Sequence, residues 1–357
     1  MRSPDTTAPG IINLRSDTQT LPTARMRQAM AEAELGDETY GEVPTVLRLE
    51  AMAAERLGTE AALLVISGTM ANLVALLTHC RPSDELFVDR EAHVLWYESG
   101  GFASVAGVVP TMVPSHRGHI LAEALEAAVR PANVHYPRAR LVWLENTHNR
   151  GGGSVMPLAD QRAVEAVARR HGLAVHLDGA RVFNAAAAQE VEAAQLASGV
   201  DSLIVDLTKG LSCPLGALLL GSREFIAEAR FHKRVLGGGM RQAGVIAACG
   251  IVALEDLVDR LAEDHARARA LAERLAAVPG LAVDPATVET NMVYVDVGAL
   301  GASSDVVAAL RADGLLVSDR PPDRIRLVTH LQISDEMVDE AIRRIVHAAE
   351  RLSGPTR

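Results

Sequence analysis

The sequence is poor in lysine. Only two of its 35 basic residues, Lys209 and Lys233, are lysine, and the others are arginine. A guanidinium stays protonated at any accessible pH, whereas a lysine amine can lose its proton and react with an aldehyde. Each lysine is therefore a candidate for amine chemistry, although a lone lysine is more often a solvated surface charge. Lys209 is the stronger candidate because it follows an apolar run, in the segment Asp206-Leu-Thr-Lys-Gly-Leu211.

Cysteine, long apolar runs and net positive charge are scarce too. The three cysteines, Cys80, Cys213 and Cys249, are odd in number and far apart, which favours reduced thiols in a cytoplasm. No apolar stretch reaches the roughly twenty residues that span a bilayer, and residues 1–10 lack the apolar segment of a signal peptide. A net charge of -10 opposes binding to nucleic acid. We therefore expect a cytoplasmic protein with neither a membrane nor a nucleic-acid partner.

The remaining composition is that of a globular α/β protein. With 357 residues and 48% hydrophobic residues, the chain is long enough for about two domains. Short apolar runs alternate with amphipathic segments, a pattern typical of a parallel sheet with crossover helices. The expected strands of a large domain are residues 61–66, 85–88, 141–144, 173–177, 202–207 and 215–220, and its expected helices are residues 45–57, 70–79, 121–129, 158–171 and 223–236.

A smaller domain is expected after the glycine run at residues 237–239. The alanine-rich residues 241–277 predict one long connecting helix. Further strands and helices then predict a small α+β domain, with strands at residues 292–297, 315–317 and 325–328 and helices at residues 304–313 and 335–352. We expect three parts: an N-terminal segment that packs with the small domain (residues 1–35), a large domain (residues 36–245), and the connecting helix with the small domain (residues 246–357).

Polar residues follow four of the expected strands, at the edge where open α/β sheets bind ligands. Ser67-Gly68-Thr69 begins a helix whose amides could bind a phosphate, although plain capping explains the same residues. Asp178 ends a strand, where its carboxylate could hold a protonated ring nitrogen or simply cap the next helix. Lys209 follows the next strand in the chain, and residues 145–148 follow another. An aspartate, an amine and a glycine-containing helix start are the groups that pyridoxal phosphate requires.

Short motifs extend this pattern along nearly the whole chain. They are Asn13-Leu-Arg-Ser-Asp-Thr18, Gly36-Asp-Glu-Thr-Tyr-Gly41, Ser67-Gly-Thr-Met-Ala-Asn72, Leu144-Glu-Asn-Thr-His148, His176-Leu-Asp-Gly-Ala-Arg181, Thr208-Lys-Gly-Leu211, Gly237-Gly-Gly-Met-Arg-Gln242 and Arg326-Leu-Val-Thr-His330. With this order the chain resembles the L-threonine aldolases, which are pyridoxal-phosphate enzymes of fold type I. The resemblance implies an α/β fold: a large domain with a mostly parallel seven-stranded sheet flanked by helices, and a smaller C-terminal α+β domain.

The resemblance implies a site for pyridoxal 5'-phosphate. Lys209 would bind the aldehyde of the cofactor through its amine. Asp178 would bond the pyridine nitrogen and keep it protonated, and Arg181 would contact the phenolic oxygen. Gly68 and Thr69 would bind the phosphate. No metal is expected among these residues.

It also implies residues that act on an amino-acid substrate. His93, in Glu91-Ala-His-Val94, would stack on the cofactor ring, although it could be only a buried histidine at a helix start. Ser16 and Arg326 would bind the substrate carboxylate, which suits the geometry of a guanidinium. His135 would lie near the β-hydroxyl. Arg241 would approach a cofactor phosphate, in its own subunit or in a partner subunit.

The implied reaction is the cleavage of L-threonine or L-allo-threonine, and of related β-hydroxy-α-amino acids, to glycine and an aldehyde. The base could be His93, His135 or a water between them, and the sequence leaves the preferred stereoisomer open. Another reaction of the same cofactor, such as β-elimination, racemisation or phenylserine cleavage, is the alternative. The resemblance also implies a homo-oligomer, usually a tetramer, with active sites at a dimer interface.

Asp206 is the departure from the family pattern that bears most on the chemistry. It lies three residues before Lys209, where an apolar residue is usual. If its side chain points inward, it would change how readily the Lys209 amine loses its proton. If it points to the other face, it is merely solvated.

Overall fold

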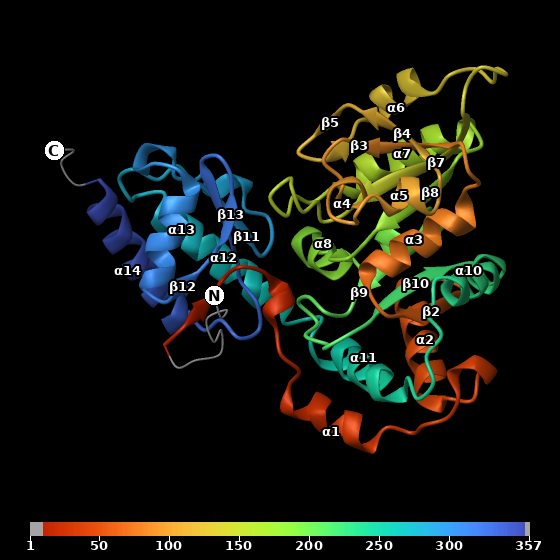
Figure 1. Ribbon diagram of the computed structural model, residues 1–357, viewed down its shortest axis with the longest axis horizontal. Helices are drawn as coiled ribbons and strands as arrows, with labels where there is room; N and C mark the ends of the chain where they lie inside the picture. The colour runs from red at the N-terminus through yellow and green to blue at the C-terminus, as the bar shows by residue number, and fades with distance from the viewer. Residues whose placement is uncertain (1–9, 354–357) are drawn as a thin grey trace. The chain divides into compact units, whose positions relative to one another are not determined.

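The computed structural model describes residues 10–353 and places them in two compact units. The central unit comprises Pro22–Asp259, and the terminal unit combines the described residues up to Leu21 with those from Arg260 onward (Figure 1). Residues 1–9 and 354–357 lie outside the described part, and they include most of the N-terminal stretch for which no signal peptide is expected. The domain limits expected from the sequence, after residues 35 and 245, stay a prediction.

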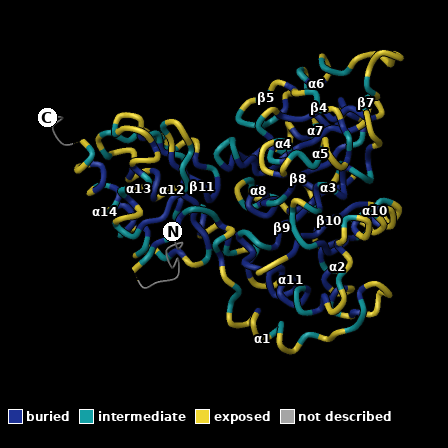
Figure 2. Tube along the Cα trace, viewed as in Figure 1, coloured by how far each residue is buried: buried dark blue, intermediate teal, exposed yellow. Residues whose placement is uncertain are grey.

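The central unit is built on a seven-stranded sheet. The strand order is β2-β10-β9-β8-β7-β3-β4, and all strands are parallel except β10, which is antiparallel to both of its neighbours. Figure 2 shows that the sheet is largely buried, which explains why most of its strands are apolar runs. The mostly parallel sheet expected from the sequence is confirmed. Its strands are β2 (Ala61–Val65), β3 (Asp84–Asp89), β4 (Val109–Val113), β7 (Arg138–Glu145), β8 (Ala174–Asp178), β9 (Ser202–Asp206) and β10 (Ala217–Gly221).

Strand β4 is absent from the set expected from the sequence. It lies at one edge of the sheet, where it pairs only with β3. Val109 and Met112 are 39% and 62% exposed, and Pro110 interrupts the apolar run. Proline and exposed side chains are tolerated at an edge, so this strand lacks the signature of a buried one.

Helices connect the strands of the central unit. α3 and α10 pack on β2, β9 and β10 through a shared core of buried aliphatic residues. α3 begins where Ser67 Oγ accepts the backbone N–H of Met70 at 3.2 Å, which is a helix N-cap. The helices are α1 (Ala24–Glu32), α2 (Pro44–Leu57), α3 (Gly68–His79), α4 (His93–Trp96), α5 (Gly101–Ser104), α6 (Ala122–Ala128), α7 (Leu158–Arg170), α8 (Val182–Gln189), α9 (Ala193–Ala197), α10 (Arg223–Val235) and α11 (Gly244–Asp256).

The terminal unit has its own core and an antiparallel sheet of order β11-β14-β13. The N-terminal strand β1 pairs in parallel with β12. Each helix within residues 10–353 is too short or too polar to span a bilayer. The elements of the unit are β1 (Ile12–Asn13), α12 (Leu261–Leu275), β11 (Met292–Asp296), α13 (Ser303–Ala312), β12 (Leu315–Leu316), β13 (Ser318–Arg320), β14 (Arg324–Val328) and α14 (Asp335–Leu352).

The prediction of one long connecting helix over residues 241–277 is wrong. α11 ends at Asp256 and α12 begins at Leu261, with a turn over residues 257–260. Arg25 pairs with Asp256 at the end of α11, and Arg260 pairs with Asp264 at 2.5 Å in the first turn of α12. Alanine-rich sequence favours helix on both sides of the turn, so it carries no signal of the interruption.

The carboxyl ends of β2, β7, β8 and β9 lie at one edge of the central sheet. These four strands run in the same direction, so the residues that follow them meet. Ser67 caps the helix after β2, Glu145 and Asp178 end β7 and β8 as register partners, and Asp206 ends β9. The expectation that the polar strand ends share one edge is confirmed.

Candidate active site

Lys209 lies in the loop that follows β9. Its Nζ is 3.2 Å from Asp206 Oδ2, and its side chain is 13% exposed. Asp206 Oδ1 accepts hydrogen bonds from the backbone N–H of Thr208 at 2.8 Å and from its hydroxyl at 2.6 Å. Because Oδ1 is engaged in this way, Oδ2 faces the amine. Of the two orientations considered for Asp206, the structure shows the inward one.

Asp178 is the buried carboxyl of the site, at the end of β8. Its Oδ2 accepts a hydrogen bond from Asn72 Nδ2 at 2.9 Å. Burial raises the pKa of Asp178, and the charge of Glu145 raises it further. His93 and Lys209 act in the opposite direction because both are close enough to stabilise the carboxylate. The structure therefore brings the predicted residues Lys209, Asp178 and His93 into one cluster.

His93 begins the short helix α4 and belongs to this cluster. Its Nδ1 lies 2.8 Å from Glu98 Oε1, and its backbone N–H donates to Glu145 Oε2 at 2.7 Å. Burial lowers the pKa of His93, but the bond to Glu98 and the charge of Asp178 outweigh it, so the pKa is raised. With Nδ1 bonded to a carboxylate, Nε2 is the nitrogen that can exchange a proton with a ligand.

Glu98 and Asn72 are site residues that sequence reasoning missed. Asn72 Nδ2 donates to Glu98 Oε1 at 2.7 Å as well as to Asp178, so it bridges the two carboxyls. Burial raises the pKa of Glu98, and the charge of Asp178 adds to the effect despite the bond from His93. Asn72 is the last residue of the motif Ser67-Gly-Thr-Met-Ala-Asn72, so the sequence could have indicated it as a site residue. Glu98 follows the short helix α4 and belongs to no motif that would have indicated it.

These hydrogen bonds also explain a cluster that has the composition of a metal site. Ligand atoms of His93, Glu98 and Asp178 lie within 4.8 Å of one another. Asn72 and His93 both contact Glu98 Oε1, and Asn72 also donates to Asp178 Oδ2. These hydrogen bonds account for the short distances among the three side chains.

Glu145, the register partner of Asp178 in the sheet, lies beside the buried histidine His148. His148 Nε2 lies 3.2 Å from Asp89 Oδ2 and 3.6 Å from Glu145 Oε2. His148 Nδ1 accepts the backbone N–H of Gly151 at 2.9 Å, so the ring proton must be on Nε2, toward the carboxylates. His148 therefore contacts Glu145, whose Oε2 accepts the backbone N–H of His93.

The start of α3 offers backbone donors beside Asp206. Ser67 acts as the helix cap, as the plain interpretation of this segment expects, and Gly68 and Thr69 form the first turn. A Cβ on Gly68 would lie 3.1 Å from Asp206 Oδ2, which is a tight contact. The absence of a side chain therefore keeps this helix start open, with its positive dipole end available to an anion.

The other predicted residues of the central unit lie in different surroundings. Arg181 is buried at the N-cap of α8, three residues after Asp178. Arg241 is exposed and contacts Asp37 and Thr39. His135 is exposed in the loop between α6 and β7, where its backbone N–H donates to Asn133. The structure places Arg181 by the cluster and leaves Arg241 and His135 at the surface.

Ser16 and Arg326 come together within the terminal unit. Arg326 is buried on β14, and its Nη2 donates to the carbonyl oxygen of Arg15 at 3.0 Å, next to Ser16 in the chain. Ser16 Oγ accepts the backbone N–H of Thr18 at 3.3 Å. The two residues predicted to bind a carboxylate are thus neighbours.

The second lysine is engaged elsewhere. Lys233 on α10 is 2% exposed, and its Nζ donates to Glu38 Oε1 at 2.7 Å. Burial lowers the pKa of Lys233, and the bond to Glu38 opposes this change. Lys233 is therefore a buried structural charge and Lys209 is the lysine of the polar cluster.

The donors of the cluster fit pyridoxal phosphate. Asp178 is a buried carboxyl at the end of β8, and its carboxylate form can accept the proton of a ring nitrogen. Lys209 supplies an amine beside it, and the open start of α3 at Gly68 suits a phosphate. These three groups are the ones that the cofactor requires, and they lie at one edge of one sheet.

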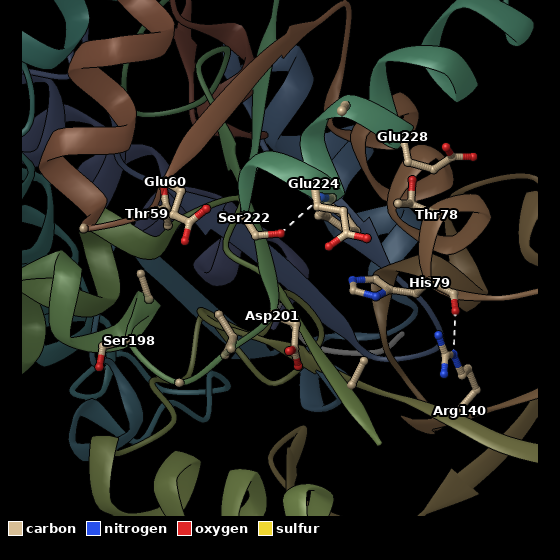
Figure 3. Close-up of a pocket in the computed structure, with 18 residues that line it drawn as sticks. Thr59, Glu60, Thr78, His79, Arg140, Ser198, Asp201, Ser222, Glu224 and Glu228 are labelled. Atoms are coloured by element: carbon tan, nitrogen blue, oxygen red, sulfur yellow. Dashed lines mark hydrogen bonds between the residues drawn. The ribbon is translucent and has the colours of Figure 1, made fainter. Parts of the chain in front are cut away.

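A large cavity of about 930 Å³ lies at the opposite edge of the sheet (Figure 3). Glu60 and Asp201, which directly precede β2 and β9, line it together with Arg140 near the start of β7. Arg140 Nε donates to the carbonyl oxygen of His79 at 2.8 Å. No residue predicted from the sequence as a site residue lines this cavity, so its size does not make it the candidate active site.

Known proteins resemble the chain in sequence and in structure. The family model described as "Beta-eliminating lyase" matches residues 13–298. The chain is 40% identical to low-specificity L-threonine aldolase 1 of Arabidopsis thaliana, over 97% of this chain and 98% of that protein. It is also 40% identical to the low specificity L-threonine aldolase of Escherichia coli K12, over 92% and 97%. The structure of a Leishmania major threonine aldolase superposes with a TM-score of 0.81 at 21% identity and covers 95% of this chain and 99% of its own.

Proposed function

The chain belongs to the L-threonine aldolases of the beta-eliminating lyase family, and from this membership and from the site we propose that it cleaves L-threonine and L-allo-threonine to glycine and acetaldehyde. The reaction makes it a carbon–carbon lyase dependent on pyridoxal 5'-phosphate. The observation that carries the proposal is the cluster of Lys209, Asp178 and His93 at one sheet edge. Nothing in the cluster favours β-elimination or racemisation.

The residues of the central unit would hold the cofactor. Lys209 would bind its aldehyde carbon, and Asp178 its ring nitrogen. Arg181 would contact its phenolic oxygen, and Gly68 with Thr69 would contact its phosphate. When bound, pyridoxal phosphate supplies an electron sink for the bond that breaks.

His93 is the residue that we assign to the proton of the substrate hydroxyl. Glu98 binds Nδ1, so Nε2 can accept that proton while the Cα–Cβ bond breaks. The raised pKa of His93 also suits the return of a proton, because the protonated ring is stabilised by Glu98 and Asp178. His135 lies on an exposed loop, and we assign it a position near the hydroxyl only in the assembled enzyme.

Ser16 and Arg326 would bind the substrate carboxylate. Arg326 is buried and anchored to the backbone at Arg15, so its guanidinium is held in one orientation. A fixed guanidinium binds a carboxylate with little loss of side-chain entropy.

The assembled enzyme is proposed to be a homotetramer with active sites at a dimer interface. Exposed Arg241 and His135 are the residues that would reach a partner subunit. All three cysteines are buried and unbridged, which supports a cytoplasmic location.

Incubation of the purified enzyme with the four stereoisomers of threonine tests the function. Acetaldehyde and glycine should appear in equal amounts from L-threonine and L-allo-threonine, and neither product from the D-isomers. The Lys209→Ala variant should give no product. Failure of the wild-type enzyme to release aldehyde from either L-isomer contradicts the proposal.

A further inference from the structure

The amine of Lys209 forms an ion pair with a carboxylate. Asp206 Oδ2 lies 3.2 Å from Nζ, and the two side chains are 8% and 13% exposed. Asp178 on β8 and His93 on α4 also act electrostatically with Lys209. The ion pair with Asp206 is the contact on which the inference below is built.

The ion pair is held by a local turn rather than by chance side-chain packing. Both hydrogen atoms that Thr208 can donate bind Asp206 Oδ1, at 2.8 Å from the backbone and 2.6 Å from the hydroxyl. The other oxygen is thereby directed at Lys209 on one side and at Gly68 on the other. Because water has little access, this pair is screened less than one at the surface.

We propose that Asp206 is a positioning residue that holds the Lys209 amine in an ion pair in the cofactor-free protein and so slows loading of the cofactor at neutral pH. An ammonium ion has no lone pair for the aldehyde. It must first lose a proton to solvent, after which the nitrogen bonds to the aldehyde carbon and one water leaves. This inference rests on the proposed function, in which Lys209 is the amine that binds the cofactor.

The Asp206→Asn variant separates this role from a structural one. Asparagine keeps an oxygen for the two bonds from Thr208, so the turn is retained. It removes the negative charge that faces Lys209. If Asp206 only shaped the turn, the variant would load cofactor at the wild-type rate.

The test measures, by absorbance, the rate at which the cofactor-free protein takes up an aldehyde. The probe is pyridoxal, which lacks the phosphate and therefore reports on the amine alone. Asp206→Asn should react about tenfold faster than wild type at pH 7, because its amine is no longer held by an opposite charge.

Asp201→Asn is the matched control. Asp201 precedes the other end of β9, roughly 17 Å from Asp206 at the rise of a β-strand, and its Oδ2 accepts the backbone N–H of Val175 at 2.7 Å. The same change of aspartate to asparagine there should leave the pyridoxal rate unchanged. Should Asp206→Asn not fold, Asp206→Ser carries the same expectation, because a serine oxygen can still accept from Thr208.

An equal or slower rate in Asp206→Asn at pH 7 overturns the inference. A different result bears on the proposed function instead. If wild-type protein takes up no pyridoxal 5'-phosphate, or if Lys209→Ala takes up as much as wild type, then Lys209 is not the amine of the site.

Discussion

Asn72 bridges two buried carboxyls of the site, so its replacement tests how those carboxyls are stabilised. Its amide donates at 2.7 Å to Glu98 and at 2.9 Å to Asp178, two buried carboxyls whose pKa values burial already raises. Hydrogen bonds to charged groups are each worth about 1.5 to 3 kcal/mol. Asn72→Ala removes two of them, so we expect the free energy of unfolding of the central unit to fall by about 3 kcal/mol near pH 8.

The pH dependence of this loss follows from the direction of the pKa shifts. An acid whose pKa is raised in the folded state is destabilising when charged, and the penalty disappears as the pH falls through the folded pKa. Asn72→Ala raises the pKa of Asp178 and Glu98 further from their ordinary values of 3.8 and 4.5. The difference between variant and wild type should therefore be large at pH 8 and shrink toward pH 5.

Urea unfolding of the cofactor-free proteins at both pH values measures the difference. Gln189→Ala is the control, because the side chain of Gln189 bonds only uncharged backbone groups. The loss of unfolding free energy in this variant should therefore be the same at both pH values. An Asn72→Ala variant that loses the same stability at pH 5 as at pH 8, or none at either, refutes the account of the bridged carboxyls.

Three further changes test other parts of the structure. Glu98→Gln should lower the pKa of His93, because it removes the bond and charge that raise it, and so move the acid limb of the kcat/KM profile to lower pH by about one unit; an unmoved limb contradicts the role of His93. Gly118→Ala should destabilise the protein by several kcal/mol on thermal unfolding, since a Cβ there would overlap the His148 ring and the residue has a φ of +89°; wild-type stability would be inconsistent with this packing. Ser67→Ala should cost about 1 kcal/mol by the same assay through loss of the α3 cap, and an unchanged melting temperature would argue against that cap.

The parts of the site that the sequence predicted are those that the sheet itself positions. Asp178 and the Lys209 loop follow apolar strands that run in the same direction, and parallel strands must bring their ends together. Periodicity was therefore enough to place them. The orientation of Asp206 was not predictable in this way, because it depends on two hydrogen bonds from Thr208.

The parts that the sequence missed depend on contacts between distant segments. Glu98 meets Asn72 across 26 residues, and Asn72 meets Asp178 across 106, so neither bond leaves a local pattern. The turn between α11 and α12 was hidden for a different reason, since alanine-rich sequence favours helix throughout. Edge strand β4 was hidden by exposed residues and a proline.

Peptide mass mapping after borohydride reduction of the enzyme loaded with pyridoxal 5'-phosphate identifies the lysine that binds the cofactor. Only Lys209 and Lys233 can carry a side-chain modification, because the sequence has no other lysine. We expect one phosphopyridoxyl group, on the peptide that contains Lys209, and none on that of Lys233, whose amine is buried against Glu38. A modification found on Lys233, or on neither lysine, would contradict this expectation.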